Sequence, residues 1–120
     1  MASLLERLGG RDGLAVVIAG LVARIRTDAR LLSRCAGVAR LRHERHLTEY
    51  FVDLLDPVPQ PAVTVRAPRR PPADAAAVEI FLGHLADTLT AAGVSTRLGE
   101  EVVGAVARVR EDLTWSEIFG

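Results

Sequence analysis

The sequence predicts a single, nearly all-helical domain, and three observations lead to this class. Apolar residues recur at intervals of three and four along most of the chain, which is the spacing of one helix face. No segment carries a convincing strand signal, although residues 62–65 could be extended. The 120 residues suffice for one domain with a core but not for two. We therefore expect one all-α domain over residues 1–120.

Three helices are expected in the first half of the chain. Ser3 begins a Ser-Leu-Leu-Glu capping box, so a short helix starts there and ends at the pair Gly9-Gly10. Asp12 is expected to cap a second helix that runs to about residue 27. A third helix is expected over about residues 38–55, after a turn. The apolar stripe of the second helix is Leu14, Val17, Ile18, Leu21, Val22 and Ile25; the inward residues expected on the third are Leu41, Leu47, Tyr50, Phe51 and Leu54.

A proline-rich loop separates these helices from two later ones. Residues 56–72 read DPVPQPAVTVRAPRRPP, and six prolines in that stretch remove backbone donors and disfavour helix. Asp74 is then expected to cap a helix that runs to Ala92 and stops at Gly93. Ser95 opens a last helix, expected to reach about residue 112, with the stripe Leu98, Val102, Val103, Val106 and Val109.

Charge and composition exclude several kinds of partner. Fifteen basic and fifteen acidic residues leave no net charge, which disfavours binding to nucleic acid or to an anionic membrane. Cys35 is the only cysteine, so no internal disulfide forms, and the first residues lack the plan of a signal peptide. The longest nearly uncharged run, residues 13–23, is too short to span a bilayer. We expect a cytoplasmic protein.

Two histidines in RLRHERHLTEY, residues 40–50, are the candidate metal or cofactor ligands. His43 and His46 are three residues apart, so both imidazoles lie on one side of the expected helix. The alternative is a solvated surface, because a charged His-Glu-Arg segment at a helix start is often exposed. A non-haem metal site would need a third ligand such as Cys35 or Glu44, since two histidines do not complete a zinc or iron site.

Four stretches resemble the group I truncated haemoglobins: SLLERLGGRDGLAVVIAGLVARI, HLTEYFVDLL, EIFLGHLADTLTAAGV and VVGAVARVREDL. The resemblance covers roughly residues 3–113, which we take as the core of the domain, and leaves a tail over 114–120. It implies a truncated globin fold, in which two antiparallel helix pairs form a 2-on-2 helical sandwich around a haem. The proline-rich loop would replace the proximal helix of that family.

The residues that serve haem in this family are absent at the matching positions. The proximal histidine would fall within residues 67–70, where no histidine occurs. The tyrosine that contacts iron-bound oxygen corresponds to Val22, and the frequent distal glutamine to Leu47. The aromatic residue that wedges the haem corresponds to Arg34 or Cys35. These departures argue against an ordinary oxygen carrier.

The resemblance places His43 and His46 where the distal helix lies over the haem face. We therefore predict an atypical haem pocket, with His46 as the better iron ligand and His43 as a second base or hydrogen-bonding neighbour. The predicted cofactor-contacting residues are His46, His43, Val22, Leu47, Tyr50 and Cys35. His84, in the Gly-His-Leu stretch of a later helix, is interpreted as a helix-face residue without a chemical role.

Three functions are weighed. The first is a haem protein that binds a diatomic gas or small molecule, or carries out redox chemistry. The second is a haem-free globin whose apolar pocket binds or transforms an organic molecule, or which serves as a sensing module. The third is a structural partner protein that dimerises or docks through its apolar tail, which contains Trp115, Ile118 and Phe119. A homodimer is compatible with each.

Overall fold

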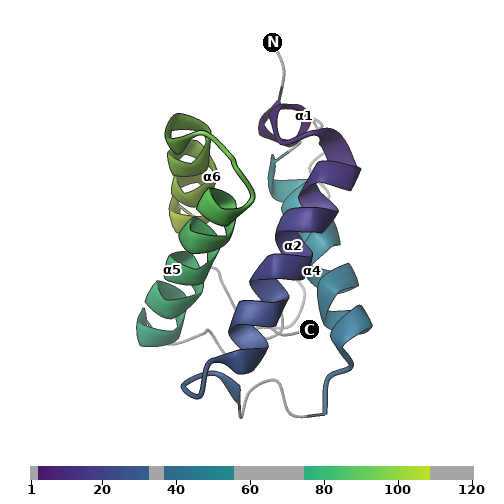
Figure 1. Cartoon of the computed structure of the whole chain (residues 1–120), viewed down its shortest axis with the longest axis vertical. Helices are drawn as coiled ribbons and strands as arrows, with labels where there is room; N and C mark the ends of the chain where they lie inside the picture. The colour runs from purple at the N-terminus through teal and green to yellow at the C-terminus, as the bar shows by residue number, and fades with distance from the viewer. Residues whose placement is uncertain (1–2, 33–36, 56–74, 109–120) are drawn as a thin grey trace, which may run out of the picture.

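The computed structural model describes residues 3–32, 37–55 and 75–108. Figure 1 shows the helices of these segments. Their bounds are α1 Leu4–Arg7, α2 Gly10–Thr27, α4 Arg40–Leu55, α5 Ala75–Ala91 and α6 Thr96–Arg108. The described residues contain no strand. Within them, no helix is both long and apolar enough to cross a membrane.

The helices form two antiparallel pairs. Figure 1 shows α2 and α4 side by side and running in opposite directions, and α5 and α6 paired in the same way. The pairs meet because α2 also packs against α5, while the short α1 contacts α2, α4 and α6. The predicted all-α, 2-on-2 sandwich is therefore confirmed.

Two of the expected helix caps are present, and one is wrong. The backbone N–H of Glu6 donates to Ser3 Oγ at 3.2 Å, and that of Leu98 donates to Ser95 Oγ at 3.2 Å. However, α2 begins at Gly10, before Asp12, and its N-cap is Gly9 with φ 101°. Glycine takes this left-handed conformation at little cost. The turn after α1 therefore ends at Gly9, and α2 begins before the predicted cap at Asp12.

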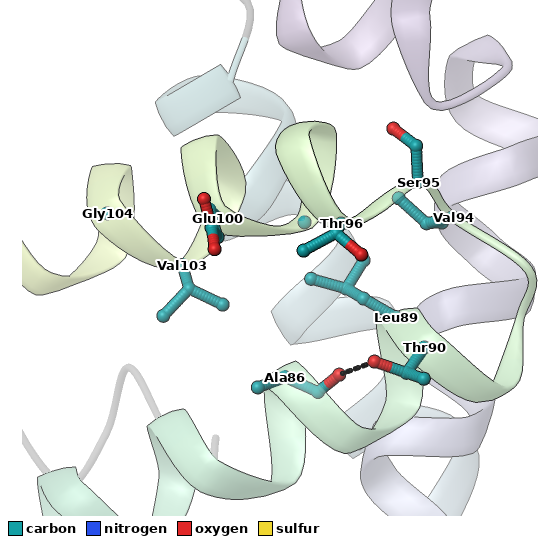
Figure 2. A pocket seen from close by; sticks show the side chains of 10 residues that line it. Ala86, Leu89, Thr90, Val94, Ser95, Thr96, Glu100, Val103 and Gly104 are labelled. Carbon is teal, nitrogen blue, oxygen red and sulfur yellow. Dashed lines mark hydrogen bonds between the residues drawn. The ribbon is translucent and has the colours of Figure 1, made fainter.

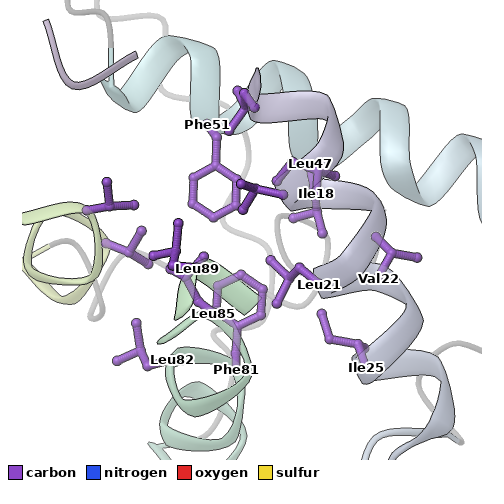
Figure 3. Packing of buried hydrophobic residues seen from close by; sticks show 14 of the residues in the cluster. Ile18, Leu21, Val22, Ile25, Leu47, Phe51, Phe81, Leu82, Leu85 and Leu89 are labelled. Atoms are coloured by element: carbon purple, nitrogen blue, oxygen red, sulfur yellow. The ribbon is translucent and has the colours of Figure 1, made fainter. Parts of the chain in front are cut away.

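The core lies between the helix pairs, as Figure 3 shows. The rings of Phe51 on α4 and Phe81 on α5 stack at a centroid distance of 6.4 Å. All six residues of the predicted α2 stripe are buried. On the other helices the buried apolar residues are Leu5, Leu47, Phe51, Leu55, Ala77, Val78, Phe81, Leu82, Leu85, Leu89, Val102 and Val106.

The inward face of α4 differs from the prediction, most clearly at Leu41. Leu41 was expected to point inward but is 66% exposed. The buried residues are instead every fourth one: His43, Leu47, Phe51 and Leu55. Two residues correspond to about 200° around a helix, so burying His43 turns Leu41 to solvent.

Other predictions fall partly outside the described residues. Helix α5 ends at Ala91, one residue before the expected position, and Gly93 follows with φ 82°. The proline-rich loop at 56–72, the last residues of the predicted final helix at 109–112 and the tail at 114–120 all lie outside.

Candidate functional site

The two predicted histidine ligands lie in the first two turns of α4, and the core reaches one of them. His43 is 0% exposed, although it is flanked by charged residues in the sequence. Its place four residues before Leu47 puts it on the buried stripe. The surface interpretation is therefore wrong for His43.

His46 is partly buried, and its ring nitrogen Nε2 has an unusual environment. This atom is covered by protein and has no hydrogen-bond partner. Leaving a buried polar atom unpaired costs roughly 1–3 kcal/mol. Helix α4 therefore presents an imidazole nitrogen whose bonding capacity the described protein leaves unused.

Of the other residues predicted to contact a cofactor, some lie in or against the core and one lies outside the described residues. Val22 on α2 and Leu47 on α4 are both 0% exposed and belong to the packed core. Tyr50 is partly buried, and its ring meets Phe51 edge to face at a centroid distance of 5.7 Å. Cys35 lies outside the described residues, as do residues 67–70, where the family would place its proximal ligand.

A non-haem metal site finds little support in the described segments. Glu44, weighed as a third ligand, accepts a hydrogen bond from Arg40 at 3.3 Å on the surface of α4. Within residues 3–32, 37–55 and 75–108, no three histidine, cysteine or acidic side chains are grouped as a metal site requires.

The chemistry of His46 on α4 would suit a haem iron. An imidazole nitrogen is the donor that suits this iron, and coordination would satisfy the unpaired Nε2 of His46. The same atom is covered by protein, so an iron reaches it only when neighbouring side chains move. His46 would therefore be the described residue that holds a haem iron, and haem entry would require local opening.

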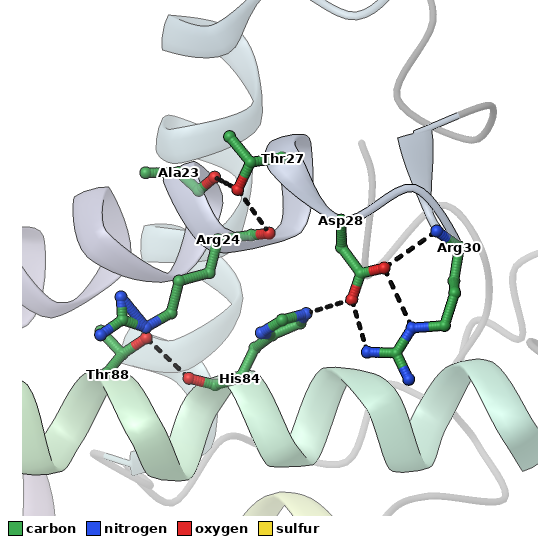
Figure 4. A network of polar contacts seen from close by, with 7 residues as sticks. All are labelled: Ala23, Arg24, Thr27, Asp28, Arg30, His84 and Thr88. Carbon is green, nitrogen blue, oxygen red and sulfur yellow. Dashed lines mark hydrogen bonds and ion pairs between the residues drawn. The ribbon is translucent and has the colours of Figure 1, made fainter.

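His84 has a partner that the sequence did not indicate, as Figure 4 shows. Its Nε2 lies 2.6 Å from Oδ2 of Asp28, the C-cap residue of α2. Arg30 also binds this carboxylate, with its side chain at 2.7 Å and its backbone N–H at 2.9 Å. These bonds from Arg30, and then the one with His84, hold the pKa of Asp28 well below its usual range. The 56-residue separation in sequence explains why no local pattern revealed this network.

Two surface hollows lie away from the α4 histidines. One, of about 360 Å³, is formed between α5 and the start of α6 (Figure 2). Its lining is Ala86, Leu89, Thr90, Val94, Ser95, Thr96, Gly99, Glu100, Val103 and Gly104. The other, of about 330 Å³, lies beside His84 and Arg30. Neither hollow includes His43 or His46.

Comparisons by sequence and by structure both match this chain to truncated haemoglobins. The chain is 30% identical to the group 1 truncated haemoglobin GlbN of Mycolicibacterium paratuberculosis, over 97% of this chain and 87% of that protein. Its fold matches the crystal structure of a mutant truncated haemoglobin from Tetrahymena pyriformis in the Fe(III) form, with a TM-score of 0.76. That match covers 94% of this chain and 98% of the other at 16% identity. No protein-family model matches the sequence.

Proposed function

The chain belongs to the group 1 truncated haemoglobin family, and from this premise we propose that it binds haem with His46 as the iron ligand on the α4 side. The observation that carries the proposal is the buried Nε2 of His46, which has no hydrogen-bond partner. His43, three residues earlier on the same helix, would act as a second base or as a hydrogen-bonding neighbour.

The surrounding residues favour a role other than ordinary oxygen transport. When bound, haem supplies a site for diatomic gases and for electron-transfer chemistry. Val22 and Leu47 stand where the family resemblance would put a tyrosine and a glutamine, and neither donates a hydrogen bond. With Tyr50 and Cys35 they would form a mostly apolar lining. We therefore propose altered gas binding, redox chemistry or small-molecule chemistry.

A haem-free globin is the second candidate, and one observation favours it. Val22 and Leu47 are fully buried in a packed core, and Nε2 of His46 is covered by protein. A haem therefore has to displace packed side chains, which costs free energy. If that cost exceeds the gain from iron ligation, the fold would bind a smaller organic molecule or serve as a sensing or partner-binding module.

Titration of the purified protein with hemin, followed by visible absorption, tests the haem proposal. We expect a saturable spectrum of ligated haem in the wild type and its loss in His46→Ala, with affinity lower by about tenfold or more. Free imidazole should restore the wild-type spectrum in His46→Ala, because it refills the ligand position.

The chain contains three histidines, so the other two provide matched variants. His84→Ala should leave the hemin spectrum unchanged, because His84 lies on α5 and its Nε2 is already paired with Asp28. His43→Gln should shift the spectrum without abolishing binding if His43 is only a neighbour. Equal hemin binding by the wild type and by His46→Ala would exclude His46 as the ligand. A wild type that binds no hemin saturably would leave the haem-free candidate.

A further inference from the structure

A second unpaired nitrogen lies on α2, the helix that packs against α4. Arg26 is partly buried in the last turn of α2, and its Nη1 is covered by protein and has no hydrogen-bond partner. Arginine stays charged at all ordinary pH values. A covered guanidinium nitrogen without an acceptor costs free energy, and an anion that pairs with it removes that cost.

The side of α2 that carries Arg26 faces α4 and not α5. Arg11 marks the α4 side, because its guanidinium binds Glu49 of α4 at 2.9 Å. Gly20 marks the α5 side, because a Cβ there would lie 3.0 Å from the methyl group of Thr88. At 3.6 residues per turn, Arg26 is about 60° from Arg11 and about 120° from Gly20.

Val22 supports the same assignment. It lies one turn before Arg26 and about 40° away around α2. In Figure 3, Leu21 points toward Phe81 and Leu85 of α5, whereas Val22 projects from the other side of α2. Arg26 thus follows the residue that the family resemblance places beside the haem.

Arg26 and the two α4 histidines also share one end of the helix pair. The helices are antiparallel, so the last turn of α2 lies toward the start of α4 (Figure 1). His43 and His46 are in the first two turns of α4. The unpaired nitrogens of Arg26 and His46 therefore come from facing helices at the same end.

Among the described residues, the carboxylates next to Arg26 in sequence and at the start of α4 already pair with other arginines. Asp28, two residues after Arg26, binds Arg30 at 2.7 Å and His84 at 2.6 Å. At the start of α4, Glu44 binds Arg40 at 3.3 Å. A counter-anion for Arg26 can therefore come from a ligand.

We propose that Arg26 binds the carboxylate of an apolar ligand held between α2 and α4. This inference rests on the proposed function: in a haem protein the carboxylate is a haem propionate, and in a haem-free globin it belongs to an organic acid. The planar guanidinium accepts a carboxylate in a two-bond arrangement, which fixes the orientation of the ligand.

Pairs of acid and ester ligands isolate the contribution of the carboxylate. Iron-free protoporphyrin IX and its dimethyl ester are titrated by fluorescence, and dodecanoic acid and its methyl ester by calorimetry. We expect the wild type to prefer the acid of at least one pair by about tenfold, the size of a charge-assisted hydrogen bond. Arg26→Met should remove that preference by weakening only the acid, and Arg26→Lys should restore part of it.

Arg24→Met is the matched control, because Arg24 lies in the same turn of α2 and about 160° from Arg26 around the helix. It should keep the preference for the acid, and urea unfolding verifies that both variants are folded. A preference confined to the porphyrin pair assigns the carboxylate to haem, and one confined to the alkyl pair assigns it to an organic acid.

Two results would overturn the proposal: an acid preference that survives in Arg26→Met, or no preference for either acid in the wild type. Neither depends on iron ligation, because protoporphyrin IX carries no iron for His46 to bind. Failure of the haem proposal is instead seen in the hemin titration of His46→Ala. The two hypotheses can therefore fail separately.

Discussion

The missing Cβ of Gly13 allows the end of α1 to lie close to the start of α2. A Cβ added at Gly13, in the first turns of α2, would clash with the carbonyl oxygen of Leu8. The clash is with backbone, which cannot rotate away as the end of a side chain does. Gly83 on α5 is different, because a Cβ there meets nothing within 4 Å. A substitution at Gly13 therefore tests close packing, whereas one at Gly83 tests helix propensity alone.

Gly13→Ala should lower the free energy of unfolding by roughly 1–3 kcal/mol, because the α1–α2 turn has to shift. Gly83→Ala should raise it by roughly 0.5–1 kcal/mol, since alanine is the better helix former and finds free space. Urea unfolding of both variants measures the difference. Equal effects in the two variants would contradict the close approach at Gly13.

At the scale of elements, Asp28 joins the end of α2 to α5. Its side chain is 8% exposed and binds Arg30 beside it in sequence and His84 on α5. Arg30 and His84 lower the pKa of Asp28 in the folded protein. A carboxyl with a lowered pKa stabilises the fold above its unfolded pKa, and this stabilisation is lost as pH falls through the folded value.

Asp28→Asn should therefore be less stable than the wild type near neutral pH, and the gap should shrink as pH falls below about 3.9, the ordinary pKa of aspartate. Urea unfolding between about pH 7 and pH 3 measures the gap. Glu49→Gln is the control: the hydrogen bond from Arg11 lowers the pKa of Glu49, but the pair is exposed and should contribute less. A gap that stays constant in acid would show that Asp28 contributes by packing alone.

At the scale of the whole molecule, the stacked rings of Phe51 and Phe81 lie between the helix pairs. Phe51 comes from α4 and Phe81 from α5, and both are almost fully buried. These rings connect one helix pair to the other through the centre of the core. Their contact therefore belongs to the sandwich as a whole and not to either pair.

Phe81→Ala should lower the free energy of unfolding by roughly 3–5 kcal/mol, because it leaves a cavity where the pairs meet. That is a large part of the 5–15 kcal/mol typical of a domain. Val16→Ala on the exposed side of α2, where Val16 is 68% exposed, should change it by no more than about 0.5 kcal/mol. Thermal and urea unfolding measure both. A small effect of Phe81→Ala would mean that the pairs meet without this contact.

Local sequence determined the helices of this protein. The α2 stripe, the caps at Ser3 and Ser95 and the approximate helix bounds depend on residues within a few positions of one another, and so a periodic pattern predicts them. The family resemblance added the arrangement of the pairs, which the structure confirms. It also favoured His46 over His43 as the iron ligand, but it did not predict the state of Nε2 of His46.

Only the tertiary structure decided which face of α4 is buried and which distant side chains meet. Leu41 and His43 lie on opposite sides of α4, and the fold buries the histidine and exposes the leucine. The bond between Asp28 and His84 depends on how helices distant in sequence pack together. The same packing covers Nη1 of Arg26 and leaves it without a hydrogen-bond partner. Helix periodicity describes one helix at a time, whereas the neighbours of a side chain are set by the packing of several.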